Sequence, residues 1–214
     1  MKKTTLFLLF FLLGFFAIGQ YQAGNILLNG TLIFEGSQSE RTNGGTTVEG
    51  PKTTMFEIGP GIEFFFSDKM AFGGEINFST EQEVDSDPGN GLDETIAKTN
   101  MTAIAPFFSY YFINEDRFAL FGKIGVGFGF GKNTYEAKAG STTVTNEEEL
   151  SSFEIAFKPG IAVHLSEKFG MTATIGELGY SSTKSVNGGR EDKTSNYGLR
   201  LSPSLGFGIY FKLK

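Results

Sequence analysis

The feature that most constrains this chain is a two-residue alternation of apolar and polar side chains, repeated in eight stretches. In the fifth stretch, Ile124 and Phe128 have one parity and Lys123 has the other. A period of two residues is the pattern of a half-buried β-strand, so an all-β fold is predicted. The strands are expected at 24–36, 53–66, 70–82, 98–113, 118–131, 151–165, 169–181 and 196–213.

The gaps between these stretches alternate in length along the chain. Three gaps are tight, at 67–69, 114–117 and 166–168, and four are long and polar, near 37–52, 83–96, 132–150 and 182–195. Short turns at one end and long loops at the other are typical of antiparallel, up-and-down barrels that cross an outer membrane. The sequence therefore predicts an eight-stranded antiparallel up-and-down barrel with four long polar loops at one end.

The alternation also indicates which face of the sheet meets lipid. An eight-stranded barrel has an interior just wide enough for side chains, and the chain contains 24 Phe and 29 Gly. Large rings therefore fit on the outside, with small and charged groups inside. A Lys or Arg facing lipid at mid-bilayer would cost about 2–4 kcal/mol, and Lys123, Lys158 and Arg200 all have the inward parity. A transmembrane β-barrel is predicted, with both termini and the short turns in the periplasm.

The first nineteen residues are expected to be a signal peptide, followed by one barrel domain at 20–214. Lys2 and Lys3 precede an apolar run at 6–18, and a small-x-small site ends at Gly19. These are the three parts of a secretory signal, whereas a membrane-spanning helix needs about 20 apolar residues. We expect the mature chain to carry a formal charge of −8, because the whole chain carries −6 and loses two lysines.

Seven charged side chains of inward parity are the candidate site residues. Counted from the short turns, Glu63, Glu75, Lys123 and Lys158 are expected at one lower level, and Glu57, Glu154 and Arg200 at a higher one. Buried charges need partners, so two interior salt-bridge layers are predicted. They would form either a structural plug or the lining of a gated, narrow pore. Glu177 has the outward parity, and it should lie near the outer rim unless Gly176 forms a bulge that turns it inward.

No catalytic, metal or cofactor site is predicted. His164 is the only histidine and lies near the periplasmic end, so the outer rim has no base for nucleophilic catalysis. Cysteine is absent, and the negative charge argues against nucleic acid as a partner. The acidic loop near 83–96 leaves divalent-cation binding open, although its Gly89 and Asn90 reverse the order of an EF-hand loop.

The chain resembles the small eight-stranded outer-membrane barrels of the OmpA transmembrane domain, OmpX and OmpW kind, and more narrowly the Bacteroidetes type. The resemblance rests on the whole pattern, on the closing strand at 202–211 and on the segment at 161–165. It implies location in the outer membrane of a Gram-negative bacterium, insertion by the barrel-assembly machinery, and contact with outer-membrane lipid and lipopolysaccharide. The terminal Lys214 departs from the aromatic end common in such barrels.

From these observations we expect a monomeric, non-enzymatic integral outer-membrane protein that acts in envelope structure or in surface interaction through its extracellular loops. Two alternatives stay open at this point. One is a narrow channel or small hydrophobic-compound conduit, and the other is a lipid-modifying outer-membrane enzyme.

Overall fold

The computed structural model describes residues 23–43, 46–86, 91–115, 117–166, 169–201 and 204–212, and almost all of them are in β-strands. The strands are β1 (Asn25–Asn43), β2 (Thr46–Ser67), β3 (Met70–Asp85), β4 (Glu94–Asn114), β5 (Phe118–Ala139), β6 (Thr142–His164), β7 (Phe169–Thr174), β8 (Glu177–Asn187), β9 (Arg190–Arg200) and β10 (Ser204–Lys212). None of the described residues belongs to a helix long and apolar enough to cross a membrane. The expected signal peptide at 1–19 lies outside the described residues.

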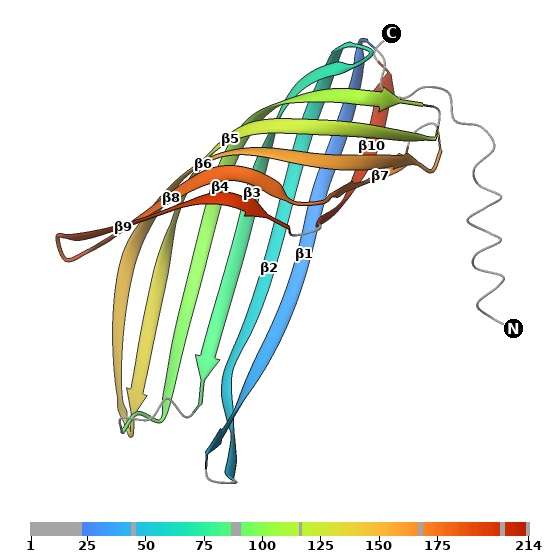
Figure 1. The fold of residues 1–214 in the computed structure, drawn as a ribbon. Coiled ribbons are helices and arrows are strands. Elements are labelled where there is room, and N and C mark those ends of the chain that lie inside the picture. The colour runs from blue at the N-terminus through green and yellow to red at the C-terminus, as the bar shows by residue number, and fades with distance from the viewer. Residues whose placement is uncertain are drawn as a thin grey trace, which may run out of the picture.

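The strands pair antiparallel in chain order from β1 to β6, and Figure 1 shows them as long, strongly twisted ribbons. β6 pairs with β7, β7 with β10, and β10 with β1. The strands therefore form a closed ring of hydrogen-bonded neighbours at the end beside the short turns. The expected eight-stranded antiparallel arrangement is confirmed, with β7 and β8 forming the seventh strand and β9 and β10 the eighth.

The seventh strand is interrupted at Ile175–Gly176. The amide of Ile175 donates a hydrogen bond to the carbonyl of Pro159, and Gly176 has a φ of 156°. A Cβ at Gly176 would lie 2.3 Å from the carbonyl oxygen of Arg200, so only glycine fits without a shift of the backbone. Beyond this break the parity changes, and Leu178 is exposed on the outer face. The expected single strand at 169–181 is therefore wrong.

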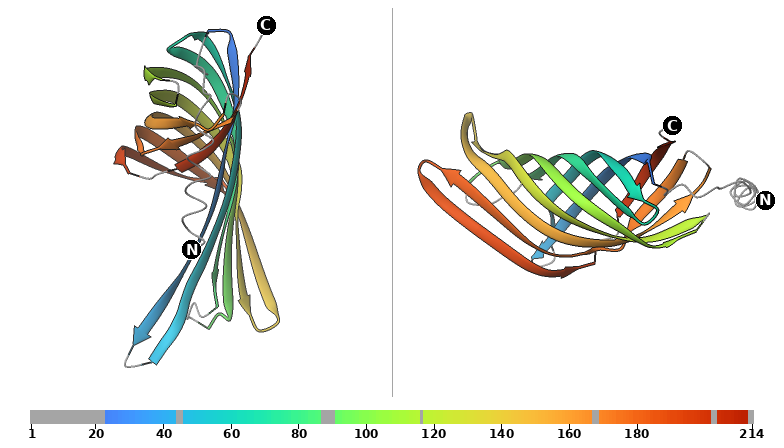
Figure 2. Two further views of the ribbon diagram at one scale, coloured as in Figure 1. Left: turned by 90° about the vertical axis from the view of Figure 1, so that its right-hand side faces the viewer. Right: turned by 90° about the horizontal axis from the view of Figure 1, so that it is seen from above.

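The sheet is not closed over its full height. β10 pairs with β1 only from Asn25↔Lys212 to Thr31↔Gly206, and β9 pairs with β8 alone. The expected continuous strand at 196–213 is thus two strands, β9 ending at Arg200 and β10 beginning at Ser204. Figure 2 shows the β8–β9 hairpin diverging from the end of β1 that is remote from the short turns, which is drawn lowest in the left-hand view. We call the gap between β9 and the part of β1 beyond Thr31 the open seam.

The four regions expected to be long loops are mostly extensions of the strands, and the loop prediction is wrong there. β5 and β6 pair as far as Ala139↔Thr142, around Gly140 and Ser141. β8 and β9 are joined by Gly188 and Gly189, whose φ angles of 54° and 89° suit a tight two-residue hairpin. Residues 44–45 and 87–90, at the other two tips, are outside the described residues.

The short turns are where the sequence places them. β2 and β3 are joined through Asp68 and Lys69, and the β4–β5 turn follows Asn114. Residues 167–168, in the third turn, lie outside the described residues. The start of β1 and the end of β10 lie at this same end of the sheet, where Asn25 pairs with Lys212.

The open seam generates a test of closure in a bilayer. Unpaired backbone groups in hydrocarbon cost several kcal/mol each, and the free edge of β1 begins at the lipid-facing Leu32. Extending the β1–β10 register from Thr31↔Gly206 places Gly36 opposite Leu201. We expect a Gly36→Cys/Leu201→Cys variant to form a disulfide in lipid vesicles, measured by its mobility on non-reducing gels.

The matched control for this test is Gly36→Cys/Arg200→Cys. The thiol introduced in place of Arg200 would face the opposite side of the sheet, because side chains alternate along a strand, so little cross-linking is expected. Equal yields from both pairs would show that β1 and β9 do not pair in this register.

Candidate functional site

The interior of the sheet is the candidate site, and the alternation places it as expected. On β2, Phe56 and Ile58 are 40% and 45% exposed on the outside, whereas Glu63 is 2% exposed on the inside. Inward glycines keep the interior narrow. A Cβ at Gly61 would lie 2.2 Å from Oδ1 of Asn29, and one at Gly160 would lie 2.5 Å from the ring of Phe121.

The end of the interior beside the short turns is filled by an apolar floor. Its buried members are Leu27, Phe65, Ala71, Tyr111, Ala119, Phe121 and Ala162. The ring centroids of Phe65 and Tyr111 are 5.2 Å apart, and those of Tyr111 and Phe121 are 5.6 Å apart. Such spacings are those of packed aromatic pairs. Three contiguous rings therefore lie across the end of the interior beside the short turns, which we call the lower end and which is drawn at the top of Figure 1.

Two acidic groups lie directly above this floor, each with a partner. The buried Glu63 carboxylate accepts a hydrogen bond of 3.1 Å from the Tyr111 hydroxyl. Lys123 forms an ion pair with Glu75, and its Nζ lies 4.1 Å from the ring centroid of Phe107. The structure therefore brings together three of the four side chains expected at the lower level.

Lys158 is expected at this lower level from the sequence, but its side chain pairs with carboxylates of the upper cluster. Its Nζ lies 3.1 Å from Oε1 of Glu154 and 3.5 Å from Oε2 of Glu177. The reason lies in the register, because Lys158 is the direct cross-strand partner of Lys123. Like charges in such positions repel, and each lysine is compensated by different carboxylates, Lys123 by Glu75 and Lys158 by Glu154 and Glu177.

The upper cluster also contains Glu177, which the sequence places near the outer rim unless a bulge at Gly176 turns it inward. Glu177 points inward and also pairs with Arg200, at 3.4 Å. The break at Gly176 causes this reversal, and Gly176 was the only signal in the sequence. Glu57 lines the same space, but it forms no ion pair with another described residue. The two expected layers are thus replaced by a lower pair and an upper network.

These groups line a cavity of about 410 Å³ that runs above the floor. Its charged lining consists of Glu35, Glu57, Glu63, Glu75, Glu154, Glu177, Lys123, Lys158 and Arg200. Six carboxylates against three cations give it an excess of negative charge. His164 is buried beside the β6–β7 turn and is absent from this lining, so the cavity contains no imidazole base.

The described residues hold no group of three or more His, Asp or Glu side chains that could bind a metal ion. The central part of the acidic 83–96 region, residues 87–90, lies outside them. Divalent-cation binding there stays an untested alternative.

Comparison with known proteins shows what this architecture is similar to. No protein-family model and no curated protein matches the chain. Among solved structures, outer membrane protein OprG from Pseudomonas aeruginosa is 18% identical, with a TM-score of 0.51 over 90% of this chain and 98% of that chain. Ail, the attachment invasion locus protein of Yersinia pestis, is 13% identical, with a TM-score of 0.38 over 89% and 100%.

The N-terminal β-barrel domain of Pseudomonas aeruginosa OprF also matches, with 10% identity and a TM-score of 0.32 over 88% of this chain and 98% of that chain. At these identities the likeness concerns the fold. The chain has the all-β, antiparallel, up-and-down fold of small outer-membrane β-barrel proteins.

The lower ion pair generates a stability prediction. Replacing Lys123 with Met should lower the free energy of unfolding by about 1–3 kcal/mol, because Glu75 would keep its charge without its partner. Adding Glu75→Gln should recover part of the loss. Urea unfolding of the protein in lipid vesicles measures both effects.

The exposed Lys132 provides the matched control, since its pair with Glu147 is 59% exposed on both sides. Lys132→Met should change stability by no more than about 1 kcal/mol. If Lys123→Met were as harmless as this control, the ion pair would have no structural role.

Proposed function

We propose that this chain is a non-enzymatic, integral outer-membrane protein of a Gram-negative bacterium, acting in envelope structure or surface interaction through its protruding hairpins. The observation that carries the proposal is the height of the outward apolar face. On β2 this face runs from Phe66 to Phe56, ten residues apart and both exposed. At about 3.3 Å per residue and a tilt of about 40° it covers about 25 Å, the thickness of the apolar band of such barrels.

The arrangement of turns supports one orientation in the membrane. Short turns and both chain ends of the sheet lie together at one end, as in barrels whose termini are periplasmic. The final strand β10 closes the circuit onto β1, which fits insertion by the barrel-assembly machinery as the last pairing step. A monomer of the Bacteroidetes type, in contact with outer-membrane lipid and lipopolysaccharide, is the form we propose.

Beyond the apolar face the strands continue as polar hairpins. β5 and β6 remain paired from Lys132↔Glu149 up to Ala139↔Thr142, and nearly all side chains of β6 in this region are exposed. A paired hairpin loses less conformational freedom on binding than an irregular loop of the same length. These ordered projections are therefore suited to contact partners outside the cell.

The position of the floor argues against the two alternatives. Contiguous rings of Phe65, Tyr111 and Phe121 obstruct a channel or conduit through the interior. His164 lies at the same lower end, far along the strands from the outer hairpins where a lipid-modifying enzyme would need its base.

Surface labelling tests the orientation. The chain has no native cysteine, so Ser141→Cys and Asn187→Cys should react with a membrane-impermeant maleimide on intact cells. Asp68→Cys, in a short turn, should react only after the outer membrane is permeabilised. Labelling of all three on intact cells would contradict the proposed topology.

Planar-bilayer conductance tests the floor. The wild-type protein should give no reproducible unit steps, because the three rings leave no continuous path for ions. Phe121→Ala removes one ring and should produce measurable current, whereas the outward Phe128→Ala should stay silent. Regular unit steps from the wild type would favour the channel instead.

A further inference from the structure

A girdle of aromatic rings marks the upper edge of the outward apolar face. On seven strands an exposed aromatic side chain of outward parity lies at this edge, and these rings are Phe34, Phe56, Phe78, Phe130, Phe153, Tyr180 and Tyr197. Girdles of this kind lie at the membrane–water interface of outer-membrane barrels. The girdle therefore locates the interface on this wall.

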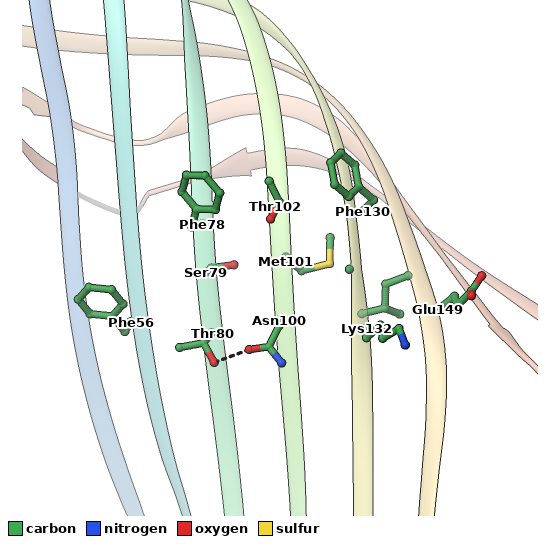
Figure 3. Close-up of a pocket in the computed structure, with 12 residues that line it drawn as sticks. Phe56, Phe78, Ser79, Thr80, Asn100, Met101, Thr102, Phe130, Lys132 and Glu149 are labelled. Carbon is green, nitrogen blue, oxygen red and sulfur yellow. Dashed lines mark hydrogen bonds between the residues drawn. The ribbon is translucent and has the colours of Figure 1, made fainter.

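Of the described strands that reach this level, β4 alone has no ring there. Its outward residue is Thr102, and the direct cross-strand partners of Thr102 are Phe78 on β3 and Phe130 on β5. Figure 3 shows Thr102 between the two rings. A small side chain between two large ones leaves a depression in the girdle.

This depression is a hollow of about 740 Å³ in the outer wall. Phe56, Phe78 and Phe130 provide its apolar sides. Thr80 and Asn100 also line it and lie nearer the hairpin tips than Thr102 (Figure 3). The Thr80 hydroxyl donates a 2.9 Å hydrogen bond to Oδ1 of Asn100, which fixes the amide with its NH₂ group unused by that bond. The hollow thus combines apolar rings beside Thr102 with hydrogen-bonding groups on the side nearer the hairpin tips.

The rim of the hollow carries both signs of charge. Lys132 and Glu149 line it and are direct cross-strand partners. One row nearer the hairpin tips, Lys98 and Glu147 also have outward parity and add one charge of each sign. Oε2 of Glu147 lies 3.3 Å from Nζ of Lys132. Two cations and two carboxylates disfavour a headgroup that is only anionic, and they complement one that has a phosphate and an amine.

We propose that this hollow binds one phospholipid molecule of the outer leaflet, with a headgroup that carries both a phosphate and an amine. Its acyl chain lies over Thr102 between Phe78 and Phe130, its phosphate meets Lys132 and the Asn100 amide, and its ammonium meets Glu149. The inference rests on the proposed membrane location. It adds to that location a specific site with a defined lipid chemistry.

Native mass spectrometry tests this site on the mature chain. The protein is released from bilayers that contain equal amounts of phosphoethanolamine and phosphoglycerol lipids with identical acyl chains. The wild type should retain one lipid per chain, predominantly the phosphoethanolamine form. Thr102→Phe completes the girdle and should abolish retention, while Ile104→Phe, one outward position lower on β4 and outside the hollow, should leave it unchanged.

Charge variants test the recognition of the headgroup. Lys132→Gln and Glu149→Gln should each lower retention of the phosphoethanolamine lipid by about two- to fivefold, the value of one exposed ion pair of up to about 1 kcal/mol. Lys52→Gln, on an outward position away from the hollow, is the control. Equal retention of both lipids by the wild type would overturn the headgroup assignment.

The outcomes separate this inference from the proposed function. Protection of the wild type and Thr102→Phe from protease in vesicles reports membrane insertion independently of lipid retention. Failure of the wild type to insert would overturn the membrane location itself. Insertion of both proteins with equal lipid retention would overturn only the lipid site.

Discussion

The register of backbone hydrogen bonds between neighbouring strands is the constraint on which the rest of this structure depends. A slip of one residue would exchange the two faces of a strand, bringing Glu63 into lipid and Phe64 into the narrow interior. The same register sets Lys123 against Lys158, and it sets Thr102 against Phe78 on one side and Phe130 on the other. The charge network inside and the interrupted girdle outside are therefore two consequences of one pairing scheme.

The interior changes character along its height, from apolar to ionic. Rings close it beside the short turns, where Glu63 is the most buried carboxylate and has a hydroxyl partner. Farther up, Lys158 and Arg200 share Glu177, and the side chains there are partly exposed. Because an unpaired charge costs most where burial is greatest, the incompletely compensated carboxylates, such as Glu57, lie in the upper part.

Alternation alone was sufficient to predict the apolar parts of the first six strands, the face that each presents to lipid and two described short turns, because parity is a local property of the sequence. The ion pairs were harder, since Lys158 changes partners for reasons of cross-strand register rather than distance from a turn. The hairpin extensions were missed because polar strands outside a membrane lack an apolar face to reveal them. The sequence left two positions open for Glu177, and the inward one depends on a close approach of Gly176 to the Arg200 carbonyl, a contact between residues far apart in the chain.

The wall has two discontinuities, and they differ physically. At the open seam, peptide groups along one edge of β1 have no cross-strand partner among the described residues, which hydrocarbon penalises. At Thr102 the backbone is fully paired on both sides, and only side-chain volume is missing. A lipid can fill a side-chain gap through dispersion contacts without supplying backbone hydrogen bonds. A ring at Thr102 would fill the same volume without disturbing any pairing, so lipid binding at this position is separable from the stability of the fold.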